Sequence, residues 1–417
     1  MSEQLDLEFN ALDPALAADP FPKYEELRRA GRLLWFPLVG GRAQRVVPEG
    51  EALPGIWTIT RYDDCMALLR DDRVSSDPMK SELFQIVMKT MLGGESPATQ
   101  LVRHLLLFMD PPDHTRLRAL ANAAFSRKAV EELRPRINDL VDELLDAGGE
   151  IDLVSDFAYP LPVTVIAEML GVPLADRDMF GAWSRELVDL FGTEDVSSES
   201  TQRGNDAIVA MNEYFTALAD ERRTRPRDDL LTAFVEVEDK GERLTHEELL
   251  ATCLILLIAG HETTANLIGL GTLALLRDPG ALSRVRDDPG LVPTLVDELL
   301  RYDSPVQATA RTTLAPIEVA GTVIPEAQRV LVLLGSANRD PEKFDDPDRV
   351  IPERSPNPHL SFGGGIHFCL GAPLARLEAR IAFAKLVQLP LELVSEELEW
   401  RRTFPIRGLR SLRVALG

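Results

Sequence analysis

Residues 361–371 have the sequence SFGGGIHFCLG, in which three consecutive glycines come shortly before Cys369. Glycine lets a backbone adopt left-handed turns and approach a bulky group closely. A helical pattern starts near Pro373, so Cys369 comes just before a helix N-terminus, where free amides favour a deprotonated sulfur. The stretch predicts a thiolate that can bind a metal. For a lone cysteine, however, a buried structural role in a glycine-rich turn is the commoner explanation.

Two other chemistries for Cys369 have less support. A nucleophilic cysteine needs a base, and His367, two residues away, is expected to point elsewhere in an extended loop. A zinc site is disfavoured because no second pair of ligands has the spacing that zinc requires. The loop therefore favours a single metal-bound sulfur.

A long helix is predicted over residues 245–277. Thr245 and Glu248 form a capping-box pattern at its start. At about 1.5 Å per residue such a helix spans roughly 48 Å, enough to cross a whole domain. Its first half is apolar all round and should be buried, but weak helix formers begin at Gly260 in mid-helix.

The polar residues in the middle of this helix could form a ligand-binding and proton-transfer site. The hydroxyl of Thr263 can bond the carbonyl of Ala259 one turn earlier and open the helix locally. Together with the carboxylate of Glu262, this would make a niche for a diatomic ligand and a proton relay. The competing interpretation is a helix that turns polar because it reaches the surface.

Two further pairs share a helix face. Glu298 and Arg301, at i and i+3, can form a bidentate ion pair, although a solvated surface pair is the commoner case. His114 and Arg118, at i and i+4, could clamp a carboxylate. The simpler explanation of the second pair is a capped helix start with a solvated basic face.

The rest of the chain indicates one large, helix-rich domain over residues 1–417. We find no linker, like-charge block or internal repeat. Short strand patterns interrupt the helical ones, without the alternation of a doubly wound sheet, so we expect a mainly α fold with minor β. The predicted helical regions are 114–146, 160–190, 204–222, 245–277, 291–301 and 372–388, and the strand regions are 33–38, 56–60 and 311–334.

Charge and cysteine content narrow the functional classes. The net charge of −22 disfavours nucleic acid and anionic membranes as partners. Three cysteines make no disulfide framework, the N-terminus has no signal-peptide pattern, and the longest apolar stretch is too short for a bilayer span, so a soluble cytoplasmic protein is expected. Residues 112–136 and 369–388 are nevertheless basic, which suggests a docking site for something acidic.

Together, the cysteine loop, the polar centre of the long helix, the Glu298–Arg301 pair and the His114–Arg118 pair resemble the cytochrome P-450 superfamily, in particular its soluble bacterial members. The resemblance covers nearly the whole chain. Its most specific part is the Phe-x-x-Gly-x-His-x-Cys-x-Gly loop at 362–371. Further matches are the Ala-Gly-x-Glu-Thr-Thr helix, the Glu-x-x-Arg helix, Asn338-Arg339-Asp340-Pro341 and Glu353-Arg354.

The resemblance implies a cytochrome P-450 fold, with a long central helix over haem b (iron protoporphyrin IX) and small β-sheets at the periphery. Cys369 would be the axial thiolate, and Phe362 would shield its sulfur. Glu262 and Thr263 would be the acid–alcohol pair that delivers protons. The haem propionates would be bound by His114, Arg118, Arg311 and His367, and the cysteine loop would be supported by a buried network of Glu298, Arg301 and Arg354.

The implied activity is that of a haem-thiolate monooxygenase, which activates O₂ with two externally supplied electrons and hydroxylates or epoxidises a bulky apolar molecule. The electrons would come from NAD(P)H through a separate ferredoxin or flavodoxin and its reductase, since no fused reductase is expected. Arg116 and Arg376 are the candidate docking residues. A peroxygenase or oxidative-coupling enzyme of the same fold is the main alternative; a non-catalytic haem-based sensor and a cofactor-free helical scaffold have less support.

Substrate contacts are expected from the segment 79–92, which includes Phe84, although core packing explains its apolar stripe equally well. The analogy adds Ala259, Val306, Gln307 and residues 404–406, including Ile406. These positions are mostly apolar without a cluster of fixed charge, which suggests a terpenoid, steroid, fatty acid or polyketide. One departure is Ala327, where the family usually has glycine, so a positive φ is not expected there.

Overall fold

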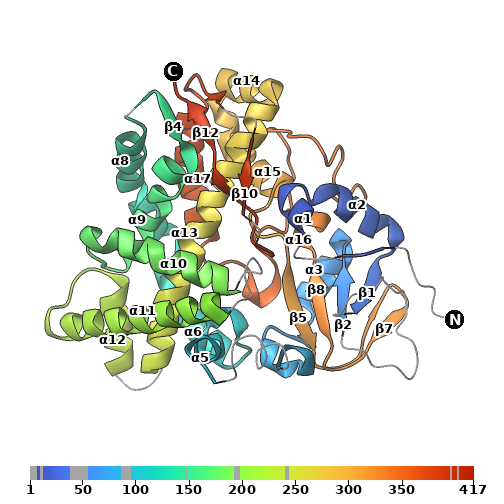
Figure 1. Cartoon of the computed structure of the whole chain (residues 1–417), viewed down its shortest axis with the longest axis horizontal. Coiled ribbons are helices and arrows are strands. Elements are labelled where there is room, and N and C mark those ends of the chain that lie inside the picture. Colours follow the sequence, from blue (N-terminus) through green and yellow to red (C-terminus); the bar gives the residue numbers. More distant parts are fainter. Residues whose placement is uncertain are drawn as a thin grey trace.

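Helix α13 (His246–Arg277) runs through the middle of the molecule, and other helices pack around it (Figure 1). Its capping box is formed as predicted: the Thr245 side chain accepts a hydrogen bond from the Glu248 amide, and the Glu248 carboxylate accepts one from the Thr245 amide. Among the described helices, α13 alone is long and apolar enough to cross a membrane, but 72% of its apolar window is buried. It is therefore packed as a core helix.

The computed structural model describes residues 7–9, 13–37, 55–85, 95–146, 148–191, 198–239, 244–394, 397–401 and 403–417. Besides α13, the helices in these ranges are α1 (Pro14–Ala18), α2 (Phe21–Ala30), α3 (Tyr62–Arg70), α5 (Pro97–His104), α6 (Asp113–Ala124), α7 (Arg127–Glu132), α8 (Arg134–Leu145), α9 (Pro160–Met169), α10 (Arg177–Phe191), α11 (Ser198–Thr224), α12 (Leu230–Asp239), α14 (Pro279–Asp287), α15 (Val292–Tyr302), α16 (Leu334–Ala337) and α17 (Ala372–Leu386). Shorter 3₁₀ or π turns are η1 (Pro78–Lys80), η2 (Leu106–Phe108), η3 (Leu153–Ala158), η4 (Leu174–Asp176), η5 (Pro289–Leu291) and η6 (Gly365–His367).

Two regions predicted as continuous helix are divided. Region 114–146 becomes α6, α7 and α8, because Ser126 caps the start of α7 and a proline stands in the first turn of α8. Region 160–190 becomes α9 and α10, because Gly171 has a φ of +75° just after α9. Local stop signals therefore override the apolar periodicity in both places.

The largest sheet stands to one side of the helices, whereas the small sheets that contain β4, β12 and β10 lie among them (Figure 1). The largest sheet has the order β1-β2-β8-β5-β3, in which β2 and β8 are parallel and the other neighbours antiparallel. The strands are β1 (Leu33–Pro37), β2 (Gly55–Ile59), β3 (Val74–Ser75), β4 (Glu150–Asp152), β5 (Thr309–Thr313), β6 (Ile317–Val319), β7 (Thr322–Ile324), β8 (Arg329–Val332), β9 (Glu392–Leu393), β10 (Glu399–Trp400), β11 (Leu409–Ser411) and β12 (Arg413–Ala415). The predicted mainly α fold with minor β is confirmed.

The expectation for Ala327 is wrong, because its φ is +61°. Its amide donates to the Thr313 carbonyl at 2.8 Å, and the Thr313 hydroxyl accepts from the Gln328 amide at 2.9 Å and donates to the Pro325 carbonyl at 2.6 Å. These bonds hold the turn in a conformation that costs a non-glycine residue about 1–2 kcal/mol. Tertiary hydrogen bonding thus replaces the usual glycine.

Candidate functional site

The cysteine loop turns twice through left-handed backbone between Phe362 and α17. Gly363 and Gly365 have φ values of +69° and +66°. A Cβ at Gly365 would collide with the Leu69 carbonyl oxygen, whereas one at Gly363 would meet nothing within 4 Å. The Cys369 amide donates to the Phe362 carbonyl at 3.0 Å and closes the loop. The glycines therefore set the backbone path and leave room beside it for a bulky group.

Opposing effects act on the pKa of the Cys369 thiol. Burial raises its pKa, while the amides of Gly371 and Ala372 and the charges of Arg118 and Arg376 lower it. The two amides act in the predicted direction, but burial is the largest effect and raises the pKa of the thiol overall. The sulfur is instead placed to lose its proton when a cation binds it, which supplies the missing positive charge.

A single sulfur also suits a metal that brings its own ligands. Within the described residues, no group of three or more His, Cys, Asp and Glu side chains could hold a metal ion. A porphyrin iron needs only one axial side chain from the protein, and a thiolate is one of its known ligands. The donor set therefore fits haem better than a metal bound by protein side chains alone.

The residues expected at the propionates come together beside this loop. The rings of His114 and His367 are 4.2 Å apart, and the Nε2 atom of each is buried without a hydrogen-bond partner in the described part of the chain. Burial, followed by the nearby charge of Arg311, lowers the pKa of His367 to about 3, and burial lowers the pKa of Arg311 to about 10. Buried polar atoms of this kind require a partner. Two carboxylates would satisfy them, so the residues present fit the propionates of haem.

Arg118 also ties this cluster to the loop. One of its terminal nitrogens donates to the Phe368 carbonyl at 2.6 Å, and its Nε donates to the Asn122 side chain at 3.2 Å. Its guanidinium is close enough to Cys369 to favour the thiolate. Arg118 thus connects α6 to the residue just before Cys369.

The polar centre of α13 has the predicted local geometry. The Thr263 hydroxyl donates to the Ala259 carbonyl at 2.8 Å, and the neighbouring Thr264 hydroxyl donates to the Gly260 carbonyl at 3.2 Å. Ala259 is exposed although residues on either side of this region are buried. This part of α13 therefore presents a small side chain and a hydroxyl to open space inside a largely buried helix.

Glu262 lies next to Thr263 in sequence but has other partners. Its Oε2 accepts a hydrogen bond from Nη1 of Arg401 at 2.8 Å, in an ion pair whose side chains are 4% and 16% exposed. Its Oε1 lies 3.8 Å from Nε2 of His261 and has no hydrogen bond in the described structure. No hydrogen bond joins the side chains of Glu262 and Thr263, both of which are described. Arg401 was not predicted, because it lies 139 residues from Glu262 in the chain.

His261 is a neutral neighbour of that carboxylate. Its Nδ1 donates to the Leu257 carbonyl at 2.6 Å, and its Nε2 lies 3.1 Å from the Ser184 hydroxyl. Burial lowers the pKa of His261. Since Nδ1 carries the hydrogen, Nε2 accepts from Ser184, so the contact with Glu262 is no charge pair.

Among the expected substrate residues, Val306 and Ile406 are paired in an antiparallel bridge. Gln307 is buried: its side-chain amide donates to the Ser304 carbonyl at 2.6 Å, and it packs against Gly335 of α16. Phe84 is half-buried beside the guanidinium of Arg329. The remaining residues of segment 79–92, from Ile86 to Leu92, lie outside the described residues.

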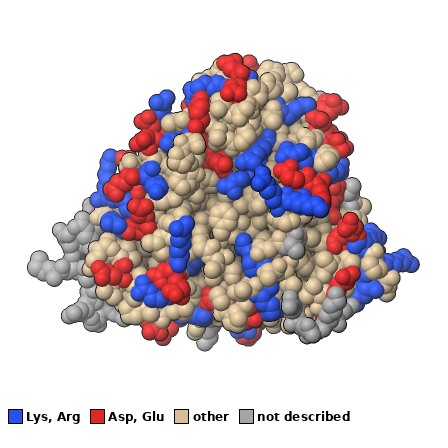
Figure 2. Space-filling model, turned by 180° about the vertical axis from the view of Figure 1, so that it is seen from behind, with Lys and Arg blue, Asp and Glu red and all other residues tan. Residues whose placement is uncertain are grey.

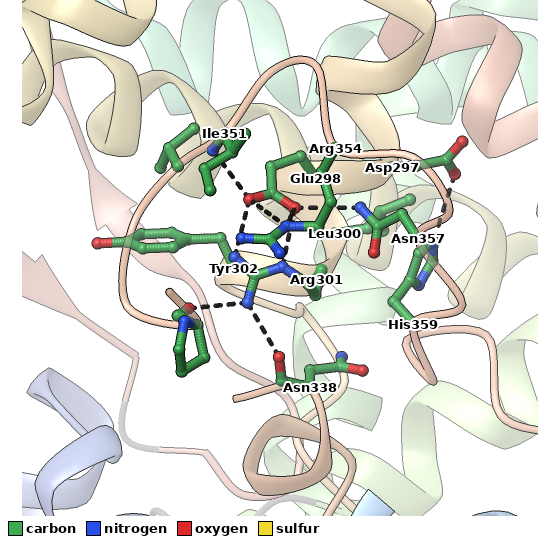
Figure 3. A network of polar contacts seen from close by, with 12 residues as sticks. Asp297, Glu298, Leu300, Arg301, Tyr302, Asn338, Ile351, Arg354, Asn357 and His359 are labelled. Atoms are coloured by element: carbon green, nitrogen blue, oxygen red, sulfur yellow. Dashed lines mark hydrogen bonds and ion pairs between the residues drawn. The ribbon is translucent and has the colours of Figure 1, made fainter. Parts of the chain in front are cut away.

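The Glu298–Arg301 pair is fully buried and bidentate, as Figure 3 shows, with both distances 2.8 Å. Arg354 and Asn357 also donate to the Glu298 carboxylate. Arg301 donates in turn to the Asn338 carbonyl at 3.0 Å. The surface interpretation of this pair is therefore wrong.

Asn338 links the Glu298–Arg301 network to the start of the cysteine loop through hydrogen bonds. Its side chain donates to the Ser361 hydroxyl at 2.9 Å and accepts from the Leu360 amide at 2.7 Å. The Ser361 hydroxyl donates to the Leu300 carbonyl on α15 at 2.7 Å. A continuous chain of bonds thus fixes the start of the loop to α15. Sequence reasoning missed Asn338 and Asn357 as members of this network.

The two candidate docking residues are engaged within the protein. Arg116 pairs with Glu248 at 2.6 Å, and Arg376 donates to Asp297 at 2.7 Å while its guanidinium lies over the Phe362 ring. Each is only partly exposed. Acids distant in sequence thus already compensate part of both charges, and the docking role of these two arginines stays a prediction.

Known proteins resemble this chain over most of its length. The family described as Cytochrome P450 matches residues 178–289 and 290–390. Cytochrome P450 107B1 from Saccharopolyspora erythraea is 45% identical, over 87% of this chain and 89% of its own. Cytochrome P450 monooxygenase PikC from Streptomyces venezuelae is 42% identical, over 98% and 94%.

A solved structure of a bacterial P450 also resembles this chain. The Bacillus subtilis cytochrome P450 PksS of the bacillaene polyketide synthase superposes with a TM-score of 0.85 at 37% identity, covering 98% of this chain and 100% of that one. The cysteine loop, the central helix and the buried Glu298 network are thus found in a chain whose relatives are P450 enzymes. The chain belongs to the cytochrome P450 family and is a haem-thiolate monooxygenase.

Proposed function

We propose that Cys369 is the axial ligand of haem b within a single haem domain. The observation that carries this proposal is the pair of buried Nε2 atoms of His114 and His367, which have no hydrogen-bond partner among the described residues and lie beside the loop that holds the sulfur. With Arg118 and Arg311 they supply donors for two carboxylates. When bound, haem supplies the oxygen-activating chemistry, and the chain supplies binding, orientation and protons.

The proton route begins at Glu262 and passes through Oγ1 of Thr263. That hydroxyl gives its hydrogen to the Ala259 carbonyl, so its lone pairs remain available to accept from an incoming donor. Arg401 holds one oxygen of Glu262, and the other has no hydrogen bond in the described structure. In this proposal Glu262 would supply protons, and Oγ1 of Thr263 would hold them near the small side chain of Ala259.

The substrate is a bulky apolar molecule that is hydroxylated or epoxidised next to Ala259. Support comes from the small exposed side chain of Ala259 and from the Val306–Ile406 bridge, which brings two apolar residues together. One relative is named for a polyketide synthase, another for vitamin D(3) hydroxylation, and one solved structure holds myristic acid, so these names support the apolar class as a whole. Ala259, Val306 and Ile406 would contact the apolar body.

The electrons come from NAD(P)H through a separate ferredoxin or flavodoxin and its reductase, in the cytoplasm. Exposed Ile366 and Phe368 flank His367 on the cysteine loop and offer an apolar contact for such a partner. Arg127 and Lys128 replace Arg116 and Arg376 as the candidate basic contacts, because both are exposed at the start of α7, which packs against α17.

The deciding experiment compares the ferrous-carbonyl spectra of the wild type and Cys369→Ala. We expect the red-shifted band of a thiolate-ligated haem only in the wild type. An unchanged band in the variant would overturn the assignment of the ligand. Turnover with a surrogate ferredoxin pair and mass spectrometry of the products then separates an oxygenase from a sensor, and turnover with peroxide alone would favour the peroxygenase alternative.

A further inference from the structure

Arg329 opens strand β8 and faces away from the residues expected at the haem propionates. In the antiparallel pairing of β5 with β8, Arg329 is opposite Thr312, whereas Arg311 is opposite Val330. Directly paired residues point to the same face of a sheet and successive residues to opposite faces. Arg329 and Arg311 therefore emerge on different faces. In Figure 1, β5 and β8 stand on the side of the sheet nearer to the helices.

The guanidinium of Arg329 has little to compensate its charge. Its only hydrogen bond among the described residues is from Nη1 to the Thr312 hydroxyl at 3.0 Å. The nearest acid to influence it is Asp77, whose carboxylate accepts from the Met79 amide at 2.8 Å and caps η1. Burial, and then the nearby charge of Arg311, lowers the pKa of Arg329 to about 10. Arg329 is partly exposed, and within the described part of the chain only the Thr312 hydroxyl accepts from it, so its other N–H donors are available to an anion.

The surroundings of Arg329 indicate where such an anion would come from. Arg311 acts on His367 and is influenced by Asp110, so its charge belongs with the propionate cluster on the other side of the sheet. Arg329 instead lies 5.6 Å from the centre of the Phe84 ring, in the segment expected to contact substrate. A charged group and an aromatic ring side by side match a molecule with an anionic end and an apolar body.

We propose that Arg329 binds a carboxylate of the substrate, with the apolar body of that molecule continuing past Phe84. This assignment rests on the proposed function and narrows its substrate class to bulky apolar acids. It adds one fixed charge to a substrate site that is otherwise expected to be mostly apolar. The same guanidinium chemistry could serve a haem carboxylate, so the test must separate the two sources.

The test measures the dissociation constants of hexadecanoic acid and of its methyl ester from ligand-induced Soret shifts of the holoprotein. The variants are Arg329→Gln, which removes the charge, and Arg329→Lys, which keeps it. Arg73→Gln is the matched control, because Arg73 is exposed beside the same sheet and pairs with Asp71. Haem content per protein is measured for each variant.

We expect the wild type to bind the acid more tightly than the ester. Arg329→Gln should weaken acid binding by roughly tenfold or more and leave ester binding unchanged, since only the acid loses a charge-assisted hydrogen bond. Arg329→Lys should retain part of the preference, and Arg73→Gln all of it.

Two results would overturn the assignment. Equal affinity of the wild type for acid and ester, with the carbonyl band intact, would remove the carboxylate site and leave the proposed function standing. Loss of haem from Arg329→Gln with an unchanged ratio of acid to ester affinity would assign the guanidinium to a haem carboxylate. A missing carbonyl band in the wild type would instead overturn the proposed function, and this assignment with it.

Discussion

Arg401 and Glu262 form an ion pair across 139 residues of sequence, with Nη1 of the arginine 2.8 Å from Oε2 of the glutamate. The arginine follows β10, and the glutamate belongs to the polar centre of α13. Arg401, in the C-terminal region, therefore fixes the orientation of the Glu262 carboxylate, which the proposed proton route uses.

Replacing Arg401 by Gln should destabilise the protein and slow turnover together. Removal of one partner leaves a buried carboxylate without its cation, at a cost of about 1–3 kcal/mol for a pair that is not completely buried. Urea denaturation of the holoprotein measures this cost. The double variant with Glu262→Gln should regain stability but not turnover.

The matched control for that variant is Arg413→Gln, which breaks the exposed ion pair with Glu150 and should change stability by less than about 0.5 kcal/mol. Equal losses from Arg401→Gln and Arg413→Gln would show that Arg401 has no special role.

Thr263→Ala should uncouple electron use from product formation. The variant loses the hydroxyl at which protons are positioned, so NAD(P)H oxidation continues, product falls by about tenfold or more, and hydrogen peroxide rises. Thr264→Ala is the control, because its hydroxyl makes the same kind of backbone bond, to Gly260, one position along. Product per NAD(P)H and peroxide are measured in parallel. An unchanged yield in Thr263→Ala would remove this residue from the relay.

The parts of the site that sequence predicts well lie within single helices. Thr263 and Ala259 are four residues apart, and Glu298 and Arg301 are three apart, so helix geometry alone brings each pair together. The capping box of α13 is local in the same way.

The parts that sequence missed depend on residues far apart in the chain. The ion pairs of Arg116 with Glu248 and of Arg376 with Asp297 were not predicted, because the partners lie 132 and 79 residues apart. The pKa of Cys369 depends on burial, which no local pattern gives. The positive φ of Ala327 depends likewise on hydrogen bonds to a strand 14 residues earlier.

Breaking the buried Glu298–Arg301 network should weaken the attachment of the cysteine loop to α15. Arg301→Lys cannot make the bidentate contact to Glu298 or reach its carbonyl partners with the same geometry, so we expect a loss of at least about 3 kcal/mol of stability and weaker haem retention. Arg134→Lys tests an exposed i,i+3 pair with Glu131 and should stay within about 0.5 kcal/mol of the wild type. Normal haem content in Arg301→Lys would argue against a connection between this network and the loop.

Glu378 should make the protein less stable at high pH. Its side chain is buried on α17, and burial raises its pKa to about 8, even though the nearby Thr264 hydroxyl acts in the opposite direction. The folded protein therefore holds a proton that the unfolded chain releases near pH 4.5, so stability falls between about pH 4.5 and 8, by up to about 1.4 kcal/mol per pH unit.

Glu378→Gln removes this titration, so its stability relative to the wild type should rise between pH 5 and pH 9. Urea denaturation at pH 5, 7 and 9 measures the difference, with the exposed Glu326→Gln as the control. A difference between wild type and Glu378→Gln that does not vary with pH would contradict the buried, protonated carboxyl.

Reduction by an acidic redox partner should depend on the exposed basic residues near the cysteine side. Several Lys and Arg side chains gather across the middle of the face in Figure 2, although the whole chain is acidic. Lys128, with a side chain 88% exposed, makes only a 4.0 Å contact with Glu132. Reversing Arg127 and Lys128 to Glu should slow reduction roughly tenfold at low salt, and by less at high salt, because long-range attraction between exposed charges is screened.

The matched control is the double reversal Lys23→Glu and Arg29→Glu on α2, where both residues also belong to exposed helix pairs. It removes the same amount of positive charge from another part of the molecule and should leave the reduction rate near that of the wild type. Stopped-flow reduction with a surrogate ferredoxin separates local docking from net charge. Equal slowing in both double variants would assign the effect to net charge and discard α7 as the docking site.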